Sequence, residues 1–211
     1  MLKTILQKTL DVFQKNFLRI IGYNILFNLL KVLLMPFILT IAFVPCVTIA
    51  HTHAKIAMAR GEPVSIGNSL NEGFSLGIRP FIYNIVWTIN MTVGFLVFII
   101  PGLYLLSSWF YSSALLIDER HGVEDTLHKS SKIAKHMGLL TPYKIGLTLF
   151  SILLLSVVFL GLVLPKDPSS SSLIIDLIAI IILLLLLAYF SMIQACTYVI
   201  AKASFEEATQ S

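Results

Sequence analysis

Charged side chains are scarce in this sequence. Aspartate, glutamate, lysine and arginine make up 12% of its 211 residues, whereas hydrophobic residues make up 57%. A typical soluble domain carries about 25% charged residues. The composition therefore argues against an ordinary soluble domain. It predicts an all-α polytopic membrane bundle, formed by one integral membrane domain over residues 1–211.

Cysteine is also rare, and recognisable catalytic motifs are missing. Cys46 and Cys196 both lie inside apolar runs, which indicates small buried side chains and not a disulfide or a metal pair. His51 and His53 are two residues apart and would not share one face of a helix. No phosphate-binding loop, HExxH or dinucleotide motif occurs. We therefore expect no enzyme, no cofactor and no metal site.

Three residues near position 120 could ligate a metal, but they have a simpler interpretation. Asp118, Glu119 and His121 follow an apolar run directly. Carboxylates are ordinary at a membrane border and before the N-terminus of the next helix, where they complement the helix dipole. We interpret the three as border residues.

The longest uncharged run spans 38 residues, from Pro80 to Ile117. As one helix it would be about 57 Å long, at 1.5 Å per residue. The hydrocarbon core of a bilayer is only about 30 Å thick. Because proline lacks a backbone donor and glycine accepts positive φ, Pro101 and Gly102 are predicted to form a tight structural turn between two spans.

Three further apolar runs complete the map. Ile145–Pro165 and Leu177–Ala201 carry no charge and predict one span each. Ile20–Ala54 contains a single charge, Lys31, and allows two interpretations. It is either one kinked helix, which gives five spans, or two short spans that fold back near Met35 and Pro36, which give six.

The distribution of basic residues favours six spans. With six, both termini share one side of the membrane, and that side receives nearly all lysines and arginines. These are Lys3, Lys8, Lys15, Arg19, Lys55, Arg60, Arg79, Arg120, Lys129, Lys132, Lys135, Lys144 and Lys202. The opposite side keeps Lys166, with Lys31 in the membrane near it. The positive-inside rule then predicts that both termini are cytoplasmic.

Two cytoplasmic segments are predicted to be amphipathic helices. The first begins the chain, where Leu2, Ile5, Leu6, Leu10, Phe13 and Phe17 recur at helical spacing. The second is a short helix between spans 4 and 5, over Gly122–Met137. Its Lys129, Lys132 and Lys135 form a basic face that is either a snorkelling surface or a docking site for anionic lipid head groups or an acidic partner. The net charge of +4 requires no nucleic-acid partner.

Polar residues within the apolar runs are the remaining candidates for a site. They are Asn24, Asn28, Lys31, Asn84, Thr88, Asp176 and Gln194. Such side chains commonly form hydrogen bonds between helices, and the alternative is a polar cavity for a substrate or a lipid head group. Lys31 and Asp176 would both lie near the external surface, which makes an ion pair between them a specific expectation.

The segment IIPGLYLLSSWFYSSALLIDERHGVEDTLHKSSKIAKHMG resembles the signature of the YciC-like bacterial inner-membrane superfamily, which includes the membrane domain fused to some glycerophosphodiester phosphodiesterases. The matching residues are Pro101, Gly102, Asp118, Ser130, Lys132 and Ile133, with Arg60-Gly61 and Gly73-Phe74 upstream. The resemblance implies a membrane architecture and no settled activity. The phosphodiesterase activity belongs to a separate soluble domain that has no counterpart in these residues.

We therefore expect a non-enzymatic module in a bacterial inner membrane, supporting envelope or lipid homeostasis or interacting with other membrane proteins. The alternative is a small permease or lipid-handling transporter that uses the intramembrane polar residues. The expected partners are membrane lipids, with anionic head groups at the cytoplasmic face. A membrane-protein partner and a second copy of the chain both stay open.

Overall fold

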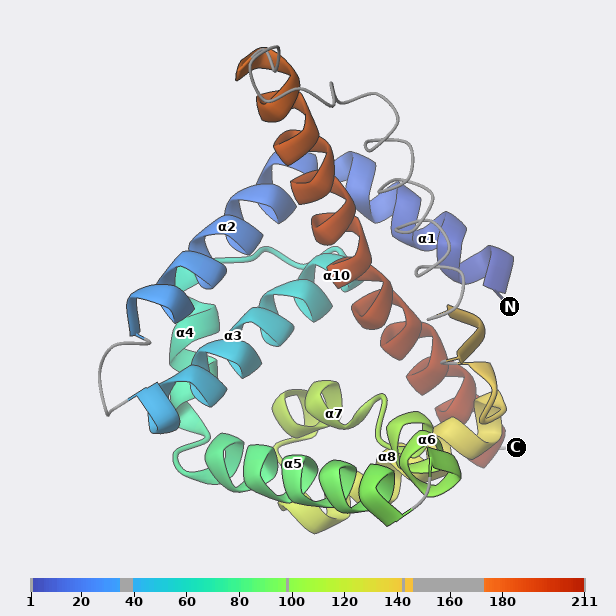
Figure 1. The fold of residues 1–211 in the computed structure, drawn as a ribbon. Coiled ribbons are helices and arrows are strands. Elements are labelled where there is room, and N and C mark those ends of the chain that lie inside the picture. Colours follow the sequence, from blue (N-terminus) through green and yellow to red (C-terminus); the bar gives the residue numbers. More distant parts are fainter. Residues whose placement is uncertain (1, 35–39, 98, 142, 146–172, 211) are drawn as a thin grey trace.

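The computed structural model describes residues 2–34, 40–97, 99–141, 143–145 and 173–210, and for residues 33–34, 40–42, 97, 99–100, 173–187 and 190–191 only the path of the helix. These residues form nine helices and no strand, which confirms the all-α class. In Figure 1, α2 and α3 lie together on one side, α10 runs diagonally across the molecule, and α5, α6 and α8 gather at the far end. Among the described residues, no helix combines the length and the apolarity that crossing a membrane requires.

The ambiguous run Ile20–Ala54 forms two helices. The first helix, α2, spans Phe17–Leu34, and α3 spans Thr40–Arg60 and contains Pro45. The two pack side by side, with the buried ring of Phe27 stacked on His51 at a centroid distance of 4.9 Å. Of the two interpretations of this run, the structure supports a pair of helices and excludes one continuous kinked helix.

The chain also folds back within the longest uncharged run, but not at Pro101 and Gly102. Helix α5 spans Arg79–Val97 and α6 spans Ile99–Ser108, so both residues lie in the first turn of α6. The predicted position of the turn is therefore wrong. Proline fits a first helical turn because the missing N–H has no partner there in any case. Gly102 instead allows close packing, since a Cβ on Gly94 of α5 would lie 3.1 Å from its Cα.

The second half of that run is divided into two helices. After α6, the chain passes through residues 109–111 and re-enters a helix as α7, Ser112–Glu119. Ser112 donates a hydrogen bond to the carbonyl oxygen of Trp109 at 2.5 Å, and its hydroxyl lies 2.7 Å from that of Tyr83. Gln194 donates to the carbonyl oxygen of Phe110 at 3.1 Å. Side chains thus satisfy the carbonyl groups that the helix break frees.

The first and last helices pack against each other. Helix α1 spans Leu2–Lys15, and α10 spans Leu173–Gln210. Ile5 and Ile193 are buried in one cluster, and Phe13 meets Tyr189 edge to face at 5.5 Å. The prediction that the N-terminal segment forms an amphipathic helix is confirmed. Its apolar residues Leu2, Ile5 and Leu6 pack with Ile193 of α10. The two helices lie side by side (Figure 1).

Two further helices, α8 and α4, pack against several of those already described. Helix α8 spans Val123–Met137, one residue shorter than predicted, and buries Leu127, Ser130 and Ile133. Helix α4, Ile66–Ser75, was not predicted. It packs on α3 through Gly73, where a Cβ would lie 2.5 Å from the carbonyl oxygen of Cys46. Only glycine allows this separation of the two backbones.

Candidate functional site

Asp118, near the end of α7, is held by three side chains from two other helices. Arg60 of α3 binds it with two parallel hydrogen bonds of 2.6 and 2.7 Å. Lys202 and Tyr198 of α10 donate to its second oxygen at 2.8 and 2.6 Å. The Asp118 side chain is only 11% exposed. Charge-assisted hydrogen bonds of this bidentate kind are among the stronger polar contacts in proteins.

The adjacent carboxylate extends this arrangement to α8. Glu119 accepts a hydrogen bond from Lys129 at 2.6 Å and pairs with Lys202 at 2.9 Å. His121 lies 3.1 Å from the same carboxylate. Together, Arg60, Asp118, Glu119, Lys129, Tyr198 and Lys202 form what we call the α7 ion cluster, which joins α3, α7, α8 and α10.

Burial and hydrogen bonding act in opposite directions on the two carboxyl groups. Burial raises the pKa of Asp118, but the hydrogen bonds from Arg60, Lys202 and Tyr198 outweigh it and hold that pKa well below its usual range. Burial also raises the pKa of Glu119, but its contacts with Lys129 and Lys202 outweigh this effect and lower that pKa. Both carboxylates are therefore ionised, and the cluster is a network of charges that compensate one another.

A second set of contacts fixes the connection between α7 and α8. Arg120 adopts a left-handed backbone with φ of 54° and forms an ion pair with Glu72 of α4. Arg79, at the start of α5, donates to the carbonyl oxygen of Arg120 at 2.6 Å. Farther along, Ser130 of α8 donates to the carbonyl oxygen of Ser108 at 2.8 Å. The segment from 118 to 130 is thus tied to α3, α4, α5, α6 and α10.

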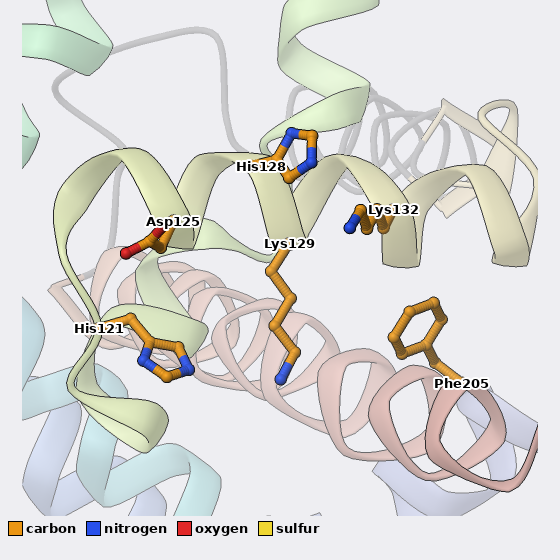
Figure 2. A pocket seen from close by; sticks show the side chains of 6 residues that line it. All are labelled: His121, Asp125, His128, Lys129, Lys132 and Phe205. Atoms are coloured by element: carbon orange, nitrogen blue, oxygen red, sulfur yellow. The ribbon is translucent and has the colours of Figure 1, made fainter. Parts of the chain in front are cut away.

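An open groove lies beside this cluster, between α8 and the C-terminal part of α10. Its volume is about 360 Å³. Figure 2 shows its lining, which comprises His121, Asp125, His128, Lys129, Lys132 and Phe205. Lys129 is engaged by Glu119, whereas Lys132 is exposed and forms no ion pair within the described part of the chain. The lining of the groove combines lysine and histidine side chains with the carboxylate of Asp125, and it has an aromatic ring on its α10 side.

The predicted polar residues do not gather into one site. Asn24 donates to the carbonyl oxygen of Ile20 in its own helix, and Thr88 bonds Asn84 within α5. Asn28, Asn84 and Thr88 are all exposed. Gln194 contacts the helix break at Phe110, as described above, and not a polar cavity. The side chain of Asp176, and with it the expected pair with Lys31, lies outside the described residues.

The three predicted lysines of α8 have separate roles. Lys129 is partly buried in the α7 ion cluster, and Lys132 and Lys135 are exposed. Sequence reasoning interpreted Asp118 and Glu119 as border residues, and it did not predict their partners Arg60, Tyr198 and Lys202. The only advance signal was that Arg60 and Asp118 both belong to the resembling motif. Among the described residues, no group of histidine, cysteine or carboxylate side chains is arranged to hold a metal ion.

No family model, curated protein or solved structure matches this chain. The resemblance to the YciC-like superfamily therefore depends on the motif residues themselves.

Proposed function

We propose that this chain is a non-enzymatic integral membrane module of a bacterial inner membrane, with six spans and both termini cytoplasmic. Its role would be to support envelope or lipid homeostasis through contacts with lipids and membrane proteins. The membership of the YciC-like superfamily is part of the same proposal. The main support for this proposal is the set of exposed apolar side chains on α2 and α5.

Large apolar side chains cover the outward faces of these two helices. On α2, Leu18 is 81% and Val32 is 60% exposed, and on α5, Ile89 is 56% and Leu96 is 80% exposed. Soluble monomers rarely expose large contiguous apolar patches, and exposed apolar side chains on helix faces suit contacts with membranes or proteins. Both helices belong to runs that the sequence predicts as spans.

The positions of the charges support the orientation. The α7 ion cluster and the Arg120–Glu72 pair draw their charged members from segments that the positive-inside rule assigns to the cytoplasm. The exposed Lys132 and Lys135 of α8 suit anionic head groups at that face. The permease alternative has less support, because Asn24 and Thr88 form hydrogen bonds within their own helices and the described polar residues do not gather around one cavity.

The orientation can be tested with reporter fusions. A reporter that is active only in the cytoplasm should be active when it is fused after Ser211 and inactive when it is inserted at Asp167. The reason is that six spans place the C-terminus inside and the link between the last two spans outside. Activity at Asp167, or its absence at Ser211, would contradict the proposed topology.

The lipid contact of α8 can be tested on the purified protein. Replacing both Lys132 and Lys135 with glutamine should weaken retention of phosphatidylglycerol about 30-fold, since each lysine near an anionic surface contributes about 1 kcal/mol. Native mass spectrometry measures the retained lipid. The matched double change to arginine keeps both charges and should retain lipid like the unmodified chain. Equal retention by the glutamine and arginine variants would argue against the contact.

A further inference from the structure

A second hollow adjoins the groove between α8 and α10. It has a volume of about 540 Å³ and is formed by α8 and by Trp109 of the break between α6 and α7. Its lining comprises Trp109, Glu124, Asp125, Leu127, His128 and Ser131. Asp125 and His128 also line the groove, so the two hollows meet at these residues.

The two hollows offer charges of opposite sign. The second hollow has the carboxylates of Glu124 and Asp125 together with the partly buried ring of Trp109. The groove has Lys132, whereas its other lysine belongs to the α7 ion cluster. Within the described part of the chain, Glu124, Asp125 and Lys132 form no ion pair. The two carboxylates lie in the first turn of α8 and complement its dipole, but the dipole gives no role to Trp109 or Lys132.

The spacing along α8 limits what can bridge these charges. Asp125, His128 and Lys132 occupy positions i, i+3 and i+7 and follow one another along the helix (Figure 2). Seven residues correspond to about 10.5 Å along the axis, which is too far for a direct ion pair. Two hydrogen bonds of about 2.8 Å cover part of this distance, so a bridging ligand must span about 5 Å between its own ammonium and anionic oxygen.

The chemistry at each end indicates which ligand fits. A primary ammonium can donate three hydrogen bonds to carboxylates, whereas a quaternary ammonium can donate none. The ring of Trp109 adds a cation–π contact. Lys132 and one ring nitrogen of His128 can donate to phosphate oxygens. At ordinary bond lengths, an amine and a phosphate oxygen joined through a two-carbon chain lie about 5 Å apart.

We propose that this surface of α8 binds a phosphoethanolamine group, with its ammonium at Glu124, Asp125 and Trp109 and its phosphate at His128 and Lys132. The group is carried either by free phosphoethanolamine or by the head group of phosphatidylethanolamine. In the second case the inference deepens the lipid contact of α8 proposed above and rests on it. It adds a requirement for the two carboxylates, which repel a purely anionic head group.

The test is native mass spectrometry of the purified full chain in neutral detergent. Phosphatidylethanolamine and phosphatidylcholine are added separately at equal concentration, and so are free phosphoethanolamine and phosphocholine. The unmodified chain should retain the ethanolamine form at least tenfold better than the choline form, because three methyl groups remove the N–H donors. Asp125→Asn should reduce this preference about tenfold without lowering the retention of phosphatidylglycerol. Lys132→Gln should lower the retention of the ethanolamine form.

Two controls carry the same chemical changes at other exposed positions. Glu207→Gln removes a carboxylate of α10, and Lys135→Gln removes a lysine of α8 that lines neither hollow. Both should keep the preference for ethanolamine over choline. Asp125 and Lys132 are also exposed, so all four variants should melt as the unmodified chain does, which separates lost binding from lost folding.

The two pairs of additions distinguish the two carriers. A preference for ethanolamine among the lipids alone identifies a head group, among the free compounds alone identifies a soluble ligand, and in both pairs identifies the shared group. No preference in either pair, or a preference that Asp125→Asn leaves intact, overturns the proposal. Retention of phosphatidylglycerol by the glutamine variant of Lys132 and Lys135 tests only the lipid contact proposed above, so the two proposals fail separately.

Discussion

Replacing Asp118 with asparagine should lower the melting temperature of the purified protein by roughly 6 to 12 °C. The substitution keeps the size of the side chain but leaves Arg60 and Lys202 facing a neutral group. Removing one partner of a buried ion pair typically costs about 3–5 kcal/mol. Because Arg60 and Lys202 are partly exposed, we expect the cost of Asp118→Asn to be about 3 kcal/mol, at the lower end of this range. For a chain of this size, 1 kcal/mol corresponds to about 2–4 °C.

Acid should remove the same contribution. Because the pKa of Asp118 is lower in the folded protein than in the unfolded chain, its stabilisation is complete above the unfolded value of about 3.9. It is lost as the pH falls from there through the folded pKa. The difference in melting temperature between the unmodified chain and Asp118→Asn should therefore be constant near neutral pH and shrink below about pH 4.

The matched control for Asp118→Asn is Glu207→Gln, which neutralises an exposed carboxylate near the end of α10. Changes at such positions usually stay within about 0.5 kcal/mol. Adding Arg60→Met to Asp118→Asn should cost less than the sum of the two single changes, since the orphaned guanidinium disappears. A melting temperature for Asp118→Asn within 2 °C of the unmodified chain would show that the α7 ion cluster does not hold the four helices together.

Replacing Gly73 with alanine should lower the free energy of unfolding by about 3 kcal/mol. The added Cβ would lie 2.5 Å from the carbonyl oxygen of Cys46 and 2.7 Å from the Cβ of Ala50. Overpacking typically costs about 1–3 kcal/mol, and the upper end applies because a helix backbone cannot yield as a flexible side chain can. Melting temperature measures the loss. Labelling of Cys46, which is 6% exposed, should accelerate as α4 moves away from α3.

Gly67→Ala is the control for Gly73→Ala, because it adds the same methyl group to the same helix. The nearest atom to its Cβ would be the hydroxyl oxygen of Ser65, at 3.8 Å. It should leave Cys46 protected and raise stability by up to about 1 kcal/mol through higher helix propensity. If both alanine variants behave alike, α4 does not pack on α3 as the structure has it.

Local pattern was sufficient to predict several elements. The periodic segment Gly122–Met137 became α8 almost to the residue, because its apolar spacing and its acidic first turn are properties of the helix itself. The interpretation of Ile20–Ala54 as a folded-back pair of helices is confirmed, because α2 and α3 are separate helices that pack side by side. The amphipathic N-terminal helix also followed from spacing alone.

Other features depended on packing that no local pattern contains. Residues 109–111 interrupt an apolar run because Ser112, Tyr83 and Gln194 satisfy polar groups around that break, and these partners come from three helices. Gly102 looked like a turn residue, yet it serves the close approach of α5 and α6. A glycine has both uses, and only the neighbouring chain decides between them.

The sequence by itself determined the helical class, the scarcity of charge and the segregation of basic residues, because these follow from composition and order along the chain. The tertiary structure decided which charges meet. Arg60 lies 58 positions from Asp118, and Lys202 lies 84 positions from it. It also decided that His51 is buried, with its Nε2 atom left without a hydrogen-bond partner in the described part of the chain. Electrostatic partnership depends on distance in space, and distance in space is fixed only when the helices pack.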